Sequence, residues 1–166
     1  MRSNRTGGTM NYPYQLRYCM QQINRNRLAN CENEFQGSFM RVLAVCSAGL
    51  LRSPTIARVL IRDFDNVNPR PVGTSSEYAL VPLDMVHLKW AHLIICANDE
   101  VMRFVTAALE ECKLERKVVH LNIPDMYNFA DPELERIIRD ELNNIRFTNE
   151  NDPRDFYVDV TLSPHQ

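Results

Sequence analysis

Short apolar stretches alternate with amphipathic stretches from Met40 onward, and this alternation is the most informative pattern in the chain. Four apolar stretches have the length and the β-branched content of buried strands. They lie at 41–45, 71–73, 92–97 and 117–121, and the second is the least well defined. Strands that alternate with helices are typical of a parallel sheet covered by helices. The pattern therefore predicts an α/β domain with four parallel strands.

The stretches between and after these strands carry residues that start helices. A proline in the first turn and a capping side chain just before an apolar periodic run both mark such starts. The expected starts are near Ser53, near Pro82, at Asn98 or Asp99, and at Asp131. In the last two helices, the residues expected to face inward are Val101, Phe104, Val105, Ala108, Leu109, Leu134, Ile137, Ile138 and Leu142.

Length and composition favour one domain with an additional segment at each end. The chain has 166 residues, of which 45% are hydrophobic, and this is enough for one domain with a substantial core. We place that domain at 39–147. Residues 1–38 are rich in Asn, Gln and Arg and carry only a loose helical pattern, so they are interpreted as an N-terminal extension. Residues 148–166 form a polar C-terminal tail.

The charge, the apolar runs and the cysteine content argue against binding to nucleic acid, insertion in a membrane, disulfides and structural zinc. The formal net charge is -2 and no long run of one sign occurs, which argues against nucleic-acid binding. No apolar run is long enough to span a membrane, and the N-terminus lacks the apolar centre of a signal peptide. Five cysteines without C-x-x-C spacing argue against disulfides and structural zinc. We therefore expect a cytoplasmic protein without membrane or nucleic-acid partners.

The stretch VLAVCSAGLLRSPTIARVL, residues 42–60, carries the candidate chemistry. Cys46 ends the first predicted strand, and open parallel sheets bind ligands at the carboxyl ends of their strands. The backbone N–H groups of loop 47–51 and the N-terminus of the following helix can together surround a phosphate. Arg52 adds a planar pair of donors for phosphoryl oxygens. These positive groups favour the thiolate form of Cys46, which is the nucleophilic form.

The spacing Cys-x-x-x-x-x-Arg-Ser-Pro after a first strand resembles the low-molecular-weight protein tyrosine phosphatases. The resemblance covers most of residues 40–142. VGTSS is similar to the segment after the second strand of that family, LKWAHLIICAND to the third strand, and NIPDMYNFADPEL to the loop with the general acid. The last segment is most similar to a short prokaryotic and phage-type branch, in which Ile-Pro-Asp-x-Tyr precedes Asp-Pro-Glu-Leu.

The resemblance implies a flavodoxin-like three-layer fold and hydrolysis of phosphotyrosine through a phosphocysteine, without a metal or cofactor. It implies that Cys46 is the nucleophile, that Arg52 binds the phosphate and that Asp125 is the general acid. The implied substrate-binding residues are Ser47, Ala48, Gly49, Leu50, Leu51, Ser53 and Tyr127. Ser53 would support the thiolate, and Tyr127 would lie beside the substrate ring. The expected partners are a phosphotyrosine protein or aryl phosphate, and phosphate-like anions.

Two positions depart from the family pattern. Family members commonly have Asn where Gly49 stands and a second Cys where Leu51 stands, so no neighbouring thiol can trap an oxidised Cys46 as a disulfide. Two other functions stay open. One is an arsenate reductase on the same fold, which needs two further thiols near each other. The other is a phosphotyrosine-binding module with weak turnover.

Other residues with reactive side chains have simpler structural explanations. Asp131 precedes a proline and a helix, so helix capping explains it before catalysis does. Cys96 lies inside an apolar strand and is expected in the core, and Cys112 on a helix is expected to take no part in the chemistry. The histidines of the domain are interpreted as structural; they are His87, His92 and His120.

Overall fold

The computed structural model of the protein describes residues 39–145. In chain order, its elements are β1 (Met40–Cys46), α3 (Arg52–Asp63), β2 (Val67–Gly73), α4 (Met85–Trp90), β3 (Leu93–Cys96), α5 (Asp99–Cys112), β4 (Lys117–His120) and α6 (Pro132–Leu142). The predicted N-terminal extension and C-terminal tail lie outside the described residues, so the predictions about them stay predictions.

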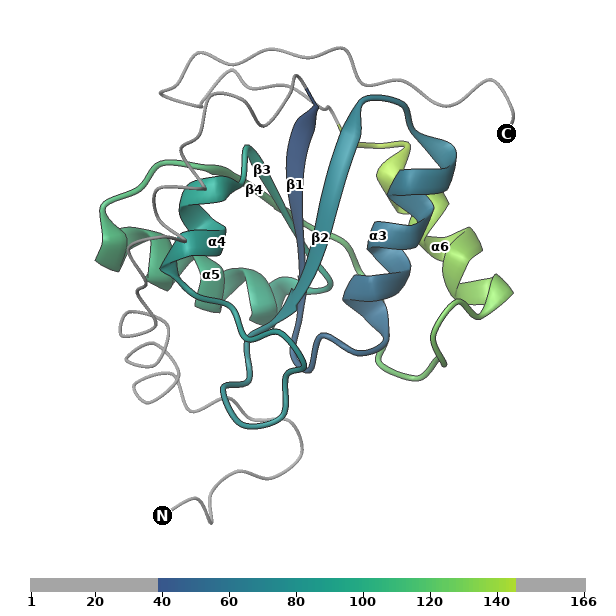
Figure 1. Ribbon diagram of the computed structural model, residues 1–166. Coiled ribbons are helices and arrows are strands. Elements are labelled where there is room, and N and C mark those ends of the chain that lie inside the picture. The colour runs from purple at the N-terminus through teal and green to yellow at the C-terminus, as the bar shows by residue number, and fades with distance from the viewer. Residues whose placement is uncertain (1–38, 146–166) are drawn as a thin grey trace.

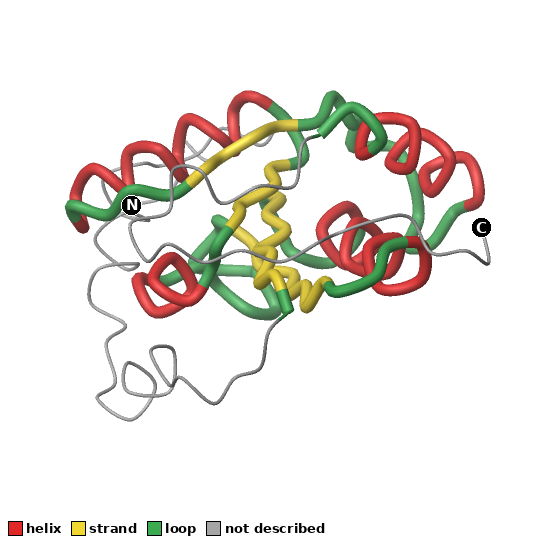
Figure 2. Tube along the Cα trace, turned by 90° about the horizontal axis from the view of Figure 1, so that it is seen from above, coloured by secondary structure: helices red, strands yellow, loops and turns green. Residues whose placement is uncertain are grey.

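The four strands form one parallel sheet in the order β2-β1-β3-β4. Helices α3 and α6 cover one face of the sheet, and α4 and α5 cover the other (Figure 1). From above, the strands form a middle layer between the helices (Figure 2). The predicted α/β, flavodoxin-like three-layer fold is therefore confirmed.

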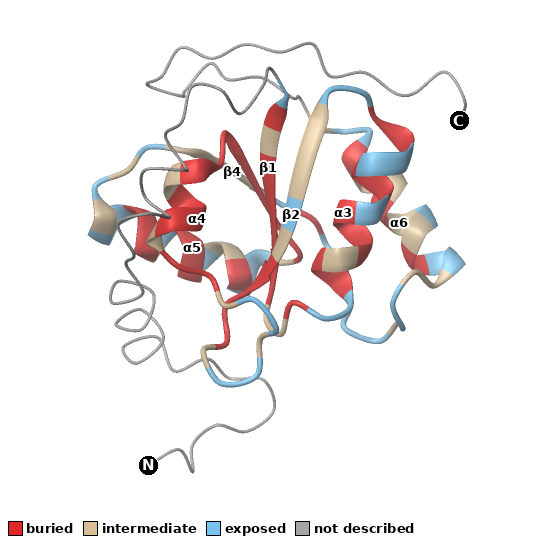
Figure 3. Cartoon of the chain, in the orientation of Figure 1, coloured by how far each residue is buried: buried red, intermediate tan, exposed pale blue. Residues whose placement is uncertain are grey.

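Strand β1 supplies side chains to the cores on both faces of the sheet. Leu43 and Val45 pack with α4 and α5, whereas Val42 and Ala44 pack with α3 and α6. Nearly the whole strand is buried (Figure 3), as expected for the centre of a parallel sheet. Because successive strand residues point to opposite faces, Cys46 at the end of β1 belongs to the face that α3 covers.

The second strand is longer than the sequence indicated. We expected it at 71–73, but β2 spans Val67–Gly73 and pairs with β1 along its full length. Pro69 and Pro71 interrupt the apolar pattern, and neither can donate a backbone hydrogen bond. Both fit because β2 is the edge strand of the sheet, where one side of the backbone needs no partner.

The helices begin close to the predicted residues, with one exception. Asn98, rather than Asp99, caps α5 by accepting a backbone hydrogen bond at 2.9 Å from Val101. The exception is α4, which begins three residues after Pro82 because Asp84 caps it. Of the nine residues expected to face inward in α5 and α6, Ile137 is partly buried and the other eight are buried.

Candidate active site

Cys46 lies at the carboxyl end of β1, where the chain leaves the sheet for α3. Its side chain is buried, and the backbone N–H of Gly49 donates to its Sγ atom at 3.0 Å. The thiol donates to the hydroxyl of Ser53 at 3.2 Å, and that hydroxyl donates to the carbonyl of Val72 in β2 at 3.1 Å. The sulfur is thus held between the following loop and the first turn of α3.

The loop 47–51 is held by backbone contacts with the segment that follows β2. The N–H of Thr74 donates to the carbonyl of Cys46, and the N–H of Ser75 donates to the carbonyl of Ser47, both at 2.9 Å. These two hydrogen bonds continue the β1–β2 pairing beyond the strands. The loop that would surround a phosphate therefore has a fixed support on the β2 side.

Two glycines permit an especially close approach at this support. Gly49 has φ of +71°, a left-handed conformation that glycine adopts without steric cost. A Cβ atom on Gly49 would lie 2.9 Å from the backbone nitrogen of Gly73, and one on Gly73 would lie 2.6 Å from the carbonyl carbon of Ala48. The absence of a side chain at Gly49 therefore has a structural reason in this chain.

Arg52 is buried at the start of α3 and joins two loops. Its Nη2 atom donates to the hydroxyl of Ser47, and its Nη1 atom donates to the carbonyl of Ile123, each at 3.3 Å. Leu51, the residue before α3, provides no side-chain cap for the helix. The guanidinium and the N-terminus of α3 therefore place positive charge beside the loop of Cys46.

Asp125 belongs to the loop between β4 and α6, and 61% of its side chain is exposed. Its Oδ1 atom lies 3.5 Å from Nε of Arg52. The start of this loop is fixed because the N–H of Ile123 donates to the carbonyl of Ala97 at 3.1 Å. Arg52 therefore brings together the loops of two predicted catalytic residues, Cys46 and Asp125.

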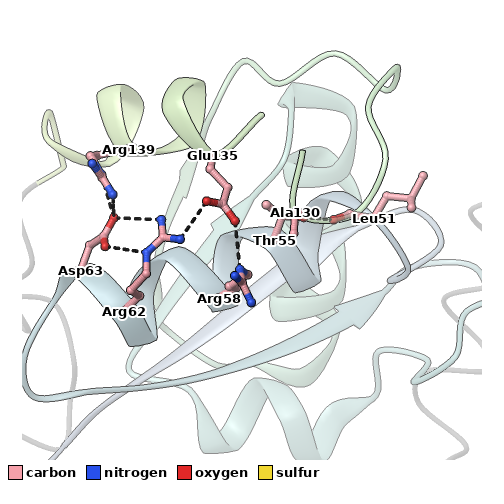
Figure 4. A network of polar contacts seen from close by, with 8 residues as sticks. All are labelled: Leu51, Thr55, Arg58, Arg62, Asp63, Ala130, Glu135 and Arg139. Carbon is pink, nitrogen blue, oxygen red and sulfur yellow. Dashed lines mark hydrogen bonds and ion pairs between the residues drawn. The ribbon is translucent and has the colours of Figure 1, made fainter. Parts of the chain in front are cut away.

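Thr55 fixes the other end of the Asp125 loop, and the sequence analysis did not identify this residue. Thr55 is fully buried; its hydroxyl donates to the carbonyl of Leu51 at 2.6 Å and accepts from the N–H of Ala130 at 3.0 Å (Figure 4). A threonine commonly donates to the carbonyl four residues earlier in a helix. The contact with Ala130 depends on the fold, so no local sequence signal predicts it.

Asp131 caps α6, as predicted. Its carboxylate accepts a hydrogen bond at 2.9 Å from the N–H of Glu133. Asp125 caps none of the helices in the described part of the chain. The two carboxylates of this loop therefore differ in structural role, which leaves Asp125 available for chemistry.

The remaining predicted substrate-binding residues lie on the same loops. Leu50 and Leu51 are exposed on the loop of Cys46, which also contains Ala48. Tyr127 is partly buried and packs against the core between the sheet, α3 and α6. It lies two residues after Asp125, and its contact with a substrate ring stays a prediction.

A network of ion pairs joins α6 to α3 (Figure 4). The buried carboxylate of Asp63 accepts from Arg62 and Arg139, and Glu135 accepts from Arg58 at 2.9 Å and from Arg62 at 2.8 Å. Burial alone would raise the pKa of Asp63, but hydrogen bonds from Arg62 and Arg139 outweigh it, so this pKa lies below its usual value. The network fixes the helix that follows the Asp125 loop.

The other two cysteines of the described residues lie across the sheet from Cys46. Cys96 is buried in the core on the α4 and α5 side, as predicted, and Cys112 packs partly buried against the same core. Burial raises the pKa of the Cys96 thiol, and burial together with the charge of Glu111 raises that of Cys112. Neither thiol is activated by its surroundings.

The histidines make local structural contacts. Nδ1 of His87 accepts from the backbone N–H of Asp84 at 3.0 Å, which completes the cap of α4. Nδ1 of His92 accepts from the N–H of Arg41 at 2.9 Å, and Nδ1 of His120 lies 3.2 Å from the carbonyl of the next residue. These contacts agree with the structural roles predicted for them.

Comparison with protein-family models, with curated proteins and with solved structures finds no match for this chain. Within residues 39–145, no three His, Cys, Asp or Glu side chains are grouped as a metal site would require. No helix in the described part of the chain is both long and apolar enough to cross a membrane. The sequence motif and the geometry around Cys46 are therefore the features of this chain that indicate a function.

Proposed function

We propose that this protein is a cysteine-dependent protein tyrosine phosphatase that hydrolyses phosphotyrosine through a phosphocysteine. The observation that carries the proposal is the position of the Cys46 sulfur. It lies at the carboxyl end of β1, 3.0 Å from the N–H of Gly49 and 3.2 Å from the hydroxyl of Ser53, in a loop that buried Arg52 joins to the loop of Asp125. Such an arrangement suits attack on a phosphoryl group.

In the first step, the Cys46 thiolate attacks phosphorus and the bond from phosphorus to the phenolic oxygen breaks. The N–H of Gly49 stabilises the thiolate, and the hydroxyl of Ser53 can turn from the Val72 carbonyl to donate to it. Arg52 donates to the phosphoryl oxygens as charge spreads over them. Asp125, exposed on its loop, gives its proton to the departing oxygen.

In the second step, the same carboxylate acts in reverse. Asp125 takes a proton from water, the water oxygen attacks phosphorus, and the sulfur–phosphorus bond breaks. Inorganic phosphate leaves, and Cys46 returns to the thiolate. Asp125 first donates a proton to the leaving group and then accepts another from water, and its exposure to water is consistent with both tasks.

The position of the other thiols favours this function over an arsenate reductase. Passing oxidation from Cys46 onward needs further thiols beside it, but Cys96 and Cys112 pack on the opposite face of the sheet. Cys19 and Cys31 lie outside the described residues. A reductase would also have no use for Asp125.

Turnover in buffer with EDTA tests the proposal. We expect release of phosphate from a phosphotyrosine peptide, much slower release from the matching phosphoserine peptide, and no thiol-dependent reduction of arsenate. Cys46→Ser should abolish turnover while the Cys112→Ser control keeps it. Equal rates on both peptides, or arsenate reduction, would refute the assignment, and phosphopeptide binding without turnover would identify a binding module.

A further inference from the structure

Large hydrophobic side chains gather on the three loops beside Cys46. Of nine such side chains exposed within residues 39–145, seven lie on loops 47–51, 74–82 and 122–131. The first loop exposes Leu50 and Leu51, and the third exposes Met126 and Phe129. We name the seven side chains the apolar rim. Exposed apolar residues scattered singly need no explanation, but residues gathered in one place mark a binding surface.

The loop 74–82 contributes the three other members of the rim, Tyr78, Leu80 and Val81. This loop is closed at its base: the N–H of Gly73 donates to the carbonyl of Val81 at 3.0 Å, and the N–H of Leu83 donates to the carbonyl of Gly73 at 2.8 Å. Leu80 is the most exposed of the three, at 75%. The two hydrogen bonds fix the base of the loop, and the three side chains are exposed on it.

The three loops are joined to one another at the candidate site. Backbone hydrogen bonds join Ser75 to Ser47, and Arg52 and Thr55 join the first loop to the third. Leu50 and Leu51 are part of the phosphate loop itself. A group whose phosphate lies in that loop is therefore close to Leu50 and Leu51, and the other two loops of the rim are joined to the same loop.

The charges of these loops are all of one sign. Residues 47–51, 74–82 and 122–131 contain no lysine or arginine, and their charged residues are Glu77, Asp125 and Asp131. Acidic residues beside a phosphotyrosine would meet like charges here, whereas apolar residues would lose contact with water against the rim. Arg52, the residue that follows the first loop, is a buried cation beside the phosphate position.

We propose that the apolar rim binds the residues flanking the phosphotyrosine and selects apolar flanks over acidic ones. This inference rests on the proposed function, and it adds the class of peptide that the site accepts. The rim gives affinity by removing apolar side chains from water, and the carboxylates of Glu77 and Asp131 discriminate against acidic sequences. Selectivity therefore arises from the loops around Cys46 rather than from the phosphate loop backbone.

Peptide binding to Cys46→Ser tests the inference without depending on turnover. Three phosphotyrosine peptides of equal length are compared by calorimetry, with valine and leucine, serine and glycine, or aspartate and glutamate flanks. We expect the apolar peptide to bind roughly tenfold more tightly than the acidic one, the scale expected for burying one large apolar side chain. Adding Leu80→Lys should reduce this ratio to about threefold or less, because a cation replaces an apolar contact.

Ile61→Lys is the matched control. Ile61 is 65% exposed on α3, about 13 Å along the helix from its start at the site, and should leave the ranking unchanged. Equal affinities for the three peptides, no binding, or a ranking that Leu80→Lys does not alter would overturn the inference. The inference would also be overturned if the protein formed a dimer that Leu80→Lys dissociates and the three peptides bound equally, because the rim would then be a contact between two copies of the chain. Hydrolysis of a small aryl phosphate by the unaltered protein tests the proposed function separately, because that substrate has no flanks.

Discussion

Arg52 combines a buried positive charge with a planar group that makes two hydrogen bonds. It is buried and donates to both Ser47 and Ile123 through separate nitrogens of one planar group. Lysine carries the same charge but cannot make two such contacts from one plane. Its role is therefore a matter of shape as well as charge.

Arg52→Lys is expected to lower kcat/KM on phosphotyrosine by about 10²-fold or more, the usual effect of removing a preorganised donor to the transition state. Steady-state kinetics with Arg58→Lys as control measures this, because Arg58 is exposed on the same helix and pairs with Glu135. A loss under tenfold for Arg52→Lys would show that charge alone is enough at this position.

The dependence of the rate on the leaving group distinguishes the role of Asp125 from that of Asp131. A proton donor matters most when the leaving group is poor, so Asp125→Asn should cost about 10²-fold or more on phosphotyrosine and much less on an aryl phosphate with an acidic phenol. Asp131→Asn is the control, since asparagine also caps helices well and both substrates should be turned over almost normally. The opposite pattern in the two variants would exchange the roles of the carboxylates.

At the residue scale, the sequence predicted the positions of Cys46, Arg52, Ser53 and Asp131 because each has a local signal: a strand end, a motif spacing or a cap. The catalytic roles given to the first three stay predictions. The sequence missed Thr55, whose contact with Ala130 arises only when α3 and the third loop pack together. Gly49 was seen as a departure from a family pattern. Its reason, a close approach to Gly73, depends on the pairing of two strands and is not visible locally.

At the scale of elements, α3 connects the loop of Cys46 to the loop of Asp125, the proposed general acid. Thr55 makes this connection with one hydroxyl, which donates to Leu51 and accepts from Ala130. Loss of the hydroxyl frees the Ala130 end of the loop while the Arg52 contact with Ile123 remains. The acid should then be misplaced more than the phosphate.

Thr55→Val, which keeps the shape but not the hydroxyl, should lower kcat on phosphotyrosine about tenfold or more, and should lower kcat on an activated aryl phosphate much less. Thr55→Ser restores the hydroxyl and should recover most of the rate. Inhibition by inorganic phosphate reports on the phosphate loop and should hardly change. Equal losses on both substrates, or weakened phosphate inhibition in the valine variant, would contradict a role in placing Asp125.

The second strand shows why element boundaries were harder to predict than elements. Pro69 and Pro71 hide the strand pattern, and they are tolerated only because β2 is at the edge. Strand order is a property of the whole sheet and is absent from the local pattern. The strands at 92–97 and 117–121 were predicted almost to the residue because nothing interrupts their apolar runs.

At the scale of the whole molecule, the ion-pair network around Asp63 links stability to pH. The pKa of Asp63 is lower in the folded protein, so its contribution is fully present above the unfolded pKa of about 3.9 and is lost as pH falls below that value. Asp63→Asn should lower the free energy of unfolding by about 1–3 kcal/mol at pH 7. The side chains of Arg62 and Arg139 are partly exposed to water. The loss of stability on Asp63→Asn should therefore be smaller than for breaking a fully buried ion pair.

Urea unfolding of the unaltered protein and of Asp63→Asn at pH 7, 5 and 3 measures this effect. The difference in stability between them should be similar at pH 7 and 5 and smaller at pH 3. Asp140→Asn serves as a control, because Asp140 pairs with Arg136 on the exposed side of α6. A difference that stays constant down to pH 3 would mean that Asp63 stabilises the fold through packing rather than charge.

Trapping the intermediate tests most directly whether Cys46 carries the phosphoryl group. The protein is mixed with an activated aryl phosphate, quenched within the first turnover and digested, and the peptide with Cys46 is weighed by mass spectrometry. We expect one added phosphoryl group on Cys46, none on Cys96 or Cys112, and no burst of phenol from Cys46→Ser. Phenol release without any adduct, at a rate that Cys46→Ser leaves unchanged, would contradict this role of Cys46.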